Sequence, residues 1–171
     1  MPHLKEGDPA PDLNLQTDSD QPFRLSALHG QNVVLYFYPK ADTPGCTKEA
    51  CAFRDASPDL SHANAVVVGV SPDAPKAQAK FKTKFGLPFT LLTDTDHHAA
   101  EQYGVWKEKS MYGKKYMGIE RTTFVIGPEG KIKKIFPKVS VEGHAQEVLA
   151  ALGEKTSGEK TSEKISAKSV I

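Results

Sequence analysis

Residues 33–38 have the sequence VVLYFY, an unbroken run of apolar and aromatic side chains. Residues 65–70, AVVVGV, form a second such run behind a stretch with helical character. Segments that are apolar on both faces are typical of parallel strands in an α/β sheet, because helices cover both sides of that sheet. The two runs therefore predict a βαβ unit at the core of the fold.

The chain beyond this unit continues with further strands and helices. Residues 89–92 and 122–126 predict two more strands. Residues 126–132, IGPEGKI, predict a turn that leads into an antiparallel partner strand. A closing helix is expected over residues 141–152, with Gly153 as its stop signal.

Another helix is expected over residues 74–85. Its apolar residues Ala77, Phe81 and Phe85 fall four positions apart on one helical face, and lysines occupy the other faces. We therefore expect the face that carries Ala77, Phe81 and Phe85 to lie on the sheet.

The chain has 171 residues, of which 39% are hydrophobic and 25% are charged, and its formal net charge is +1. This length suits one domain, which we place at residues 1–152, and the small net charge gives no reason to expect nucleic-acid or membrane partners. Residues 153–171 repeat GEKTS in tandem and continue with Ser, Lys and Glu. We expect a disordered tail there, either a solvated spacer or a segment that docks to a partner.

Targeting signals and cysteine usage bear on the compartment. No apolar run approaches the roughly 20 residues that span a bilayer, and residues 1–11 have neither a hydrophobic signal core nor an arginine-rich transit pattern. Two cysteines are too few for the disulfide framework of a secreted protein. The sequence therefore predicts a cytoplasmic protein.

The chemistry of the chain is concentrated in residues 39–51, PKADTPGCTKEAC, directly after the first strand. Thr43 suits the N-cap of a helix and Pro44 suits its first position, which places Cys46 at the third. At that place the unpaired N–H groups of the first turn and the positive end of the helix dipole stabilise an anion. The pattern therefore predicts that Cys46 is partly ionised and nucleophilic.

A thiolate alone is only a nucleophile, because a displacement reaction also needs donors that hold the substrate and stabilise the departing atom. The Thr43 hydroxyl and the first-turn amides can supply some of these donors, while Pro39 and Pro44 would shape the loop around the sulfur. The local sequence does not identify the cation that would complete the site.

The pattern Pro39-x-x-x-Thr43-x-x-Cys46 resembles the active-site signature of peroxiredoxins. The surrounding chain, over about residues 4–152, resembles their bacterioferritin-comigratory-protein, or PrxQ, subfamily. This resemblance implies an α/β protein with a thioredoxin-like fold, a central mixed β-sheet flanked by helices. It also implies reduction of hydrogen peroxide or organic hydroperoxides without a metal or another cofactor.

Residue roles follow from the same resemblance. Residues 118–124, GIERTTF, are similar to the strand that brings the family's arginine to the sulfur, so Arg121 would be the missing cation. Pro39, Thr43 and Cys46 would be catalytic with it. Glu49 matches a polar position that supports the arginine in the family.

Cys51, five residues after Cys46, matches a cysteine that resolves the sulfenic acid as an intramolecular disulfide in many members of the subfamily. Residues five apart on a regular helix are separated by about 500° of rotation and roughly 7.5 Å of rise, so the helix would have to unwind locally. Cys51 could instead simply pack against the sheet. The resemblance further implies a thioredoxin-type reductant and a monomer.

Four other interpretations are weaker. A metal site at Cys46 and Cys51 would lack nearby ligands, since His97-His98 lies in a distant polar segment that we expect to be a solvated turn. Trp106, Tyr112 and Tyr116 lie among lysines, yet the small net charge favours packing and a solvated basic loop over nucleic-acid stacking. A general thiol-disulfide oxidoreductase would carry Cys-x-x-Cys, which is absent, and a redox-regulated chaperone would not need Arg121.

Overall fold

The structure of the chain, a computed structural model, describes residues 4–153. Its central sheet has seven strands in the order β2-β1-β5-β4-β3-β8-β9. Their bounds are β1 Asn14–Thr17, β2 Pro22–Arg24, β3 Asn32–Phe37, β4 Ala65–Ser71, β5 Thr90–Thr93, β8 Thr122–Ile126 and β9 Ile132–Phe136. The expected tail lies outside the described residues, apart from Gly153.

The pairing of the strands confirms the mixed sheet. β3, β4 and β5 run parallel to one another, whereas β8 is antiparallel to β3 and β1 is antiparallel to β5. The predicted turn at residues 126–132 joins β8 to β9, which pair in antiparallel fashion. The predicted βαβ unit is β3 and β4 with two helices between them, α1 (Pro44–Asp55) and α2 (Ser57–His62).

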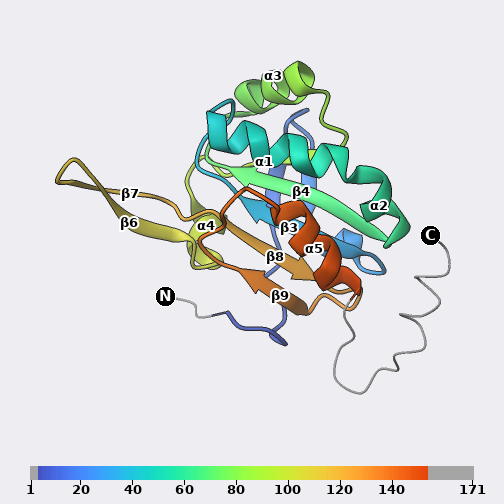
Figure 1. Ribbon diagram of the computed structural model, residues 1–171. Helices are drawn as coiled ribbons and strands as arrows, with labels where there is room; N and C mark the ends of the chain where they lie inside the picture. Colours follow the sequence, from blue (N-terminus) through green and yellow to red (C-terminus); the bar gives the residue numbers. More distant parts are fainter. Residues whose placement is uncertain (1–3, 154–171) are drawn as a thin grey trace.

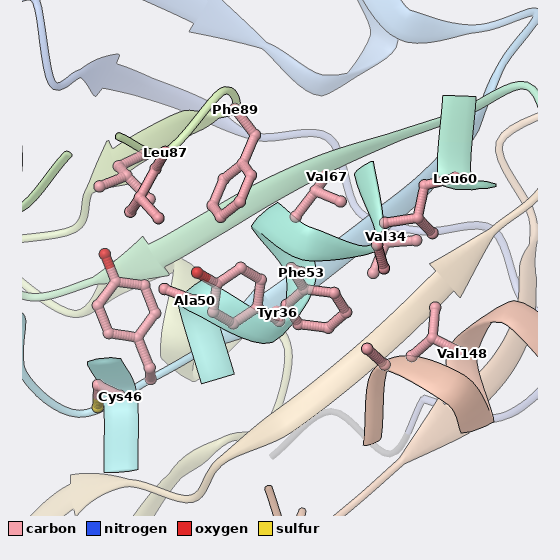
Figure 2. Close-up of a cluster of buried hydrophobic side chains, with 14 of the residues drawn as sticks. Val34, Tyr36, Cys46, Ala50, Phe53, Leu60, Val67, Leu87, Phe89 and Val148 are labelled. Carbon is pink, nitrogen blue, oxygen red and sulfur yellow. The ribbon is translucent and has the colours of Figure 1, made fainter. Parts of the chain in front are cut away.

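Helices cover both faces of the sheet (Figure 1). The long helix α1 lies with α2, α3 (Pro75–Phe85) and α5 (His144–Gly153) over one face. The other face is covered by α4 (His98–Gln102) and by η1 (Leu25–Leu28), a 3-10 helix. β3 serves both layers, because Tyr36 belongs to the first hydrophobic cluster and Phe37 to the second. Figure 2 shows the first cluster, with Cys46 at its edge.

The predicted inward face of α3 is wrong at one position. Ala77 is exposed, and Gln78 is fully buried beside Phe81. The Gln78 amide finds partners inside the protein: it accepts a hydrogen bond from the Tyr38 hydroxyl at 2.5 Å and donates one to the Leu92 carbonyl at 2.9 Å. These bonds offset the cost of burying an amide, while Phe81 and Phe85 still pack against the sheet as predicted.

The strands β6 (Trp106–Met111) and β7 (Lys114–Ile119) form a separate two-stranded hairpin that projects from the body of the protein (Figure 1). The basic loop expected here is therefore a hairpin, and packing of its tyrosines is contradicted, since Tyr112 is 98% exposed and Tyr116 is 44% exposed. Trp106 does pack, because its ring stacks on that of His97 with centroids 3.9 Å apart. Within residues 4–153, no helix combines the length and the apolar character needed to cross a bilayer.

Candidate active site

The register of two central strands brings distant parts of the chain to one place. β3 and β8 are antiparallel, and Phe37 is paired with Thr122. The end of β3, where the loop to α1 begins, therefore lies beside the start of β8, and Arg121 directly precedes β8. This pairing explains how Arg121 meets the start of α1, 75 residues away in the sequence.

The predicted start of α1 is confirmed in position. Thr43 is the N-cap with extended backbone, Pro44 is the first helical residue, and Cys46 is the third. The side chain of Thr43 does not cap the helix; its hydroxyl donates to the Lys40 carbonyl at 2.8 Å. Amides of the first turn are thus left without a side-chain partner from the cap, which favours negative charge beside them.

α1 buries one face that carries a thiol and a carboxyl group among apolar side chains. Cys46, Glu49, Ala50 and Phe53 are buried at successive helical turns. Cys46 and Glu49 are each only 1% exposed. Cys46 and Glu49 therefore lie on the same inner face as the apolar residues that dock the helix on the sheet.

The guanidinium of Arg121 joins Cys46 to Glu49. Its Nη2 donates to the Cys46 sulfur at 3.3 Å, and its Nη1 donates to Glu49 Oε1 at 2.6 Å. The side chain of Arg121 is 17% exposed, so both contacts are largely shielded from water. One planar cation thus touches the sulfur and the carboxylate together.

Burial controls the charges of this group. Burial raises the pKa of Glu49 to about 7, against the opposing effect of the charge of Arg121 and its hydrogen bond. Burial lowers the pKa of Arg121, but the charges of Glu49 and Cys46 outweigh it, and the net shift is upward. Arg121 therefore stays cationic, while the charge of Glu49 changes near neutral pH.

A buried polar network braces the loop that carries Thr43. Asp73 accepts hydrogen bonds from the Ala41 amide and the Ser71 hydroxyl, both at 2.7 Å. The Gln78 amide donates to Ser71 at 2.9 Å, and Gln78 also holds the Tyr38 hydroxyl at the end of β3. Sequence reasoning missed this network; its one local signal is Gln78 itself, three residues before Phe81 and next to the predicted inward face of α3.

The remaining predicted residues occupy less central places. Pro39 is half-buried in the loop between β3 and α1. Cys51 is half-buried on α1, and both cysteines are free thiols. Five helical positions turn Cys51 away from Cys46, so the structure does not bring the two sulfurs together.

Solvent reaches the start of α1 through an open groove of about 570 Å³. Its walls are made by Asp42, Thr43, Pro44, Thr47, Lys48 and Phe85. In the part of the chain that the structure describes, no three His, Cys, Asp or Glu side chains gather in a way that could hold a metal ion.

Comparison with known proteins adds to this geometry. Residues 6–135 match the AhpC/TSA family. The chain is 54% identical over 149 residues to the putative peroxiredoxin bcp of Coxiella burnetii, which covers 87% of this chain and 99% of that protein. It is similar to the structure of a cysteine-to-serine mutant of Xylella fastidiosa PrxQ, with a TM-score of 0.83 and 38% identity. This match covers 89% of this chain and 97% of the other. It also resembles a structure of the Xanthomonas campestris bacterioferritin comigratory protein, which was determined to study the alkyl peroxide reduction activity of that protein. The TM-score is 0.78 and the identity is 43%, and the match covers 82% of this chain and 89% of the other.

Proposed function

Because the chain belongs to the AhpC/TSA family, as a thiol peroxidase of the Bcp and PrxQ peroxiredoxins, we propose that its attacking sulfur is that of Cys46. The observation that carries this proposal is the contact of Arg121 Nη2 with the Cys46 sulfur at 3.3 Å, at the start of a helix. A cation and a helix N-terminus both favour the thiolate, which is the reactive form of cysteine.

The first step transfers one oxygen atom. The Cys46 thiolate attacks one peroxide oxygen, the S–O bond forms and the O–O bond breaks, and the leaving alkoxide or hydroxide takes up a proton. Cys46 becomes a sulfenic acid, and water or an alcohol is released. Arg121 and the first-turn amides stabilise the negative charge on the departing oxygen, while the Thr43 oxygen accepts a hydrogen bond from the peroxide.

The loop holds this arrangement in place. Pro39 sets its course between β3 and α1, and the bond from the Ala41 amide to Asp73 at 2.7 Å anchors it. Glu49 fixes the plane of the Arg121 guanidinium from the other side, at 2.6 Å. Arg121 and the first-turn amides thus offer a bound peroxide donors whose positions are already fixed.

Cys51 closes the cycle. Its thiolate attacks the Cys46 sulfenic acid, the hydroxide leaves as water with one proton, and an intramolecular disulfide forms. A thioredoxin-type dithiol then reduces this disulfide, restores both thiols and becomes oxidised itself. Substrates in this scheme are hydrogen peroxide and organic hydroperoxides, in line with the alkyl peroxide reduction described for the Xanthomonas relative.

Further properties belong to the same proposal. We infer a monomer in the cytoplasm that needs no metal or other cofactor, with residues 1–152 as the catalytic domain. The sparse cysteine usage supports a reducing compartment.

The decisive experiment mixes reduced protein with stoichiometric hydrogen peroxide and follows thiol loss and protein mass. Wild type should lose two thiols rapidly and gain a disulfide. Cys51→Ser, the matched control, should lose one thiol rapidly and form a sulfenic acid that dimedone traps at residue 46. Cys46→Ser should react no faster than a free thiol. Equally slow thiol loss in all three proteins would refute the assignment of Cys46.

A further inference from the structure

The exposed apolar side chains of the protein gather on the β6–β7 hairpin. Within residues 4–153, every large hydrophobic side chain that is exposed belongs to this hairpin. These side chains are Met111, Tyr112, Tyr116 and Met117, with exposed fractions of 55%, 98%, 44% and 47%. Tyrosine and methionine are enriched at protein–protein interfaces, and a group of exposed apolar side chains on one element marks a binding surface.

The turn of the hairpin holds one of these side chains at a conformational cost. Tyr112 and Gly113 lie between β6 and β7, and both have positive φ, 53° and 79°. Such a two-residue turn suits Asn or Gly, whereas a tyrosine in the left-handed region is strained. The ring of Tyr112 gains almost no packing from residues 4–153 in return, because the residue is almost fully exposed. Contact with another molecule would offset this strain.

The hairpin is also basic. Its two strands carry four lysines and one acidic residue, Glu108, which lies 4.0 Å from Lys115. Lys109 and Lys114 take part in none of the ion pairs found within residues 4–153. The surface that fits the hairpin is therefore apolar at its centre and acidic around it. A second copy of the hairpin does not fit in this way, since its lysines would repel those of the first.

The base of the hairpin is joined to the active site. β7 ends at Ile119, and Arg121, which donates to the Cys46 sulfur at 3.3 Å, follows two residues later. The Glu120 amide donates to the Val105 carbonyl at 2.8 Å, which closes the base of the hairpin directly before Arg121. In Figure 1 the hairpin projects from the side of the protein where α1 begins. It thus borders the end of the molecule that carries the reactive sulfur.

The dimensions of the hairpin suit a small protein partner. Each strand has six residues, and a strand rises about 3.4 Å per residue, so the hairpin extends roughly 20 Å beyond its base. A domain of about 100 residues has a radius of gyration of about 13 Å. Such a domain can reach the start of α1 and still lie along the whole hairpin. The proposed cycle requires one partner of this kind, the protein dithiol that reduces the disulfide.

We propose that the β6–β7 hairpin is the docking surface for the protein dithiol that reduces the Cys46–Cys51 disulfide. Met111 and Tyr112 pack on an apolar patch beside the dithiol of the partner, and Lys114 faces acidic residues around that patch. The hairpin binds the reductant and takes no part in the attack on peroxide. This role rests on the proposed function, since it requires a disulfide between Cys46 and Cys51.

The step that docking serves is a thiol–disulfide exchange. A thiolate of the partner attacks one sulfur of the Cys46–Cys51 disulfide and forms a mixed disulfide, and the other sulfur leaves as a thiolate that takes up a proton. The second thiol of the partner loses its proton, breaks the mixed disulfide and releases the remaining cysteine as a thiol. Two electrons pass from the partner to this chain, and the partner ends as a disulfide. Docking raises the local concentration of the attacking thiolate.

The test compares a protein reductant with a small one. Turnover with hydrogen peroxide is measured with a bacterial thioredoxin, kept reduced by its reductase and NADPH, and separately with dithiothreitol. Tyr112→Asn removes the ring but keeps a residue that suits positive φ, so the turn should fold at least as well. We expect this variant to raise the KM for thioredoxin at least about fivefold, while reduction by dithiothreitol stays at the wild-type rate.

The contribution of charge is tested on the same hairpin. Lys114→Glu should also raise the KM for thioredoxin about fivefold or more, and this KM should depend less on salt than that of wild type. Lys131→Glu is the matched control, because Lys131 is an exposed lysine in the turn after β8, at the opposite end of that strand from Arg121. It should keep the wild-type KM.

The two reductants separate this inference from the function on which it rests. Absence of wild-type turnover with either reductant would refute the proposed function. Turnover of wild type with dithiothreitol alone would overturn the docking role, and so would a KM for thioredoxin within twofold of the wild-type value in both Tyr112→Asn and Lys114→Glu.

Three other occupants of the hairpin are tested with Tyr112→Asn. Self-association is followed by light scattering, membrane binding by sedimentation with phosphatidylglycerol vesicles, and nucleic-acid binding by retention of single-stranded DNA. If wild type shows one of these and Tyr112→Asn loses it, the surface belongs to that occupant and the docking role is overturned.

Discussion

Arg121 Nη2 lies 3.3 Å from the sulfur of Cys46, although 75 residues separate the two along the chain. The contact exists because the antiparallel register of β3 and β8 sets Arg121 beside the loop that leads into α1. The same guanidinium is held from its other side by Glu49. A change to either contact should therefore alter the reactivity of the sulfur.

Replacement of Arg121 should remove stabilisation of the departing oxygen. We expect Arg121→Met to lower the second-order rate constant with hydrogen peroxide by about 10²- to 10³-fold, the usual cost of losing one such donor. Arg121→Lys keeps the charge but cannot bridge two partners, so it should recover only part of the rate. Stopped-flow measurement of thiol loss tests both expectations. A rate constant for Arg121→Met within twofold of the wild-type value would contradict the role of Arg121 in stabilising the departing oxygen.

Gly45 leaves room for the guanidinium. A β-carbon at this position would lie 3.1 Å from Arg121 Nη2, closer than the two groups can comfortably pack. Gly45→Ala should therefore displace the donor and reduce the peroxide rate about tenfold. Stability should not fall, because alanine favours a helix more than glycine does. Gly153→Ala, where no atom of residues 4–153 lies within 4 Å of the added carbon, is the matched control and should keep the wild-type rate.

Glu49 should make stability depend on pH. Its pKa is raised from 4.5 to about 7 in the folded protein. Between these values the folded state holds a proton that the unfolded chain has released, so the free energy of unfolding should fall as pH rises through this window. The loss should be of the order of 2 kcal/mol. Glu49→Gln cannot ionise and should lack this part of the dependence.

Denaturation in guanidinium chloride at pH 4.5 and pH 7.5 checks the Glu49 prediction. Other titrating groups, such as the buried His144, are common to both proteins and cancel in the difference. Equal changes of unfolding free energy in wild type and Glu49→Gln would show that Glu49 does not titrate in this range.

Disulfide formation should unwind the start of α1. Cys46 and Cys51 lie on one continuous helix, on which residues five apart are about 7.5 Å apart along the axis. Their sulfurs meet only if the first turns open. Hydrogen exchange of amides 44–54 should be faster in oxidised than in reduced protein, whereas amides 65–71 of β4 should keep their protection. Identical exchange across 44–54, with the disulfide verified by mass, would rule out the unwinding.

The core strands could be predicted well because they are buried on both faces. The runs at residues 33–38 and 65–70 are apolar without interruption, and they correspond closely to β3 and β4. The start of α1 can also be predicted, since a threonine followed by a proline marks a helix N-terminus by local rules alone. These rules place Cys46 at the third helical position without any information on tertiary contacts.

The exposed strands and the distant partners could not be predicted in this way. β6 has the sequence WKEKSM, which lacks the alternation that marks a half-buried strand, so its sequence predicts a basic loop rather than a hairpin. Arg121 and Glu49 were suggested by family resemblance, whereas their contact depends on strand register over 72 residues. The stem of Lys109 on β6 lies over Gly118 on the opposite strand β7, and no local pattern in the sequence marks that approach.

That glycine has a consequence for evolution. The space above Gly118 is filled by the stem of Lys109, so the two positions share one volume. A larger residue at 118 is compatible only with a shorter or redirected side chain at 109, and a lineage that loses the lysine is released from the need for glycine. Positions 109 and 118 should therefore vary together across the family, whereas Gly113, which meets no atom of residues 4–153 within 4 Å, is favoured by the positive φ of its turn.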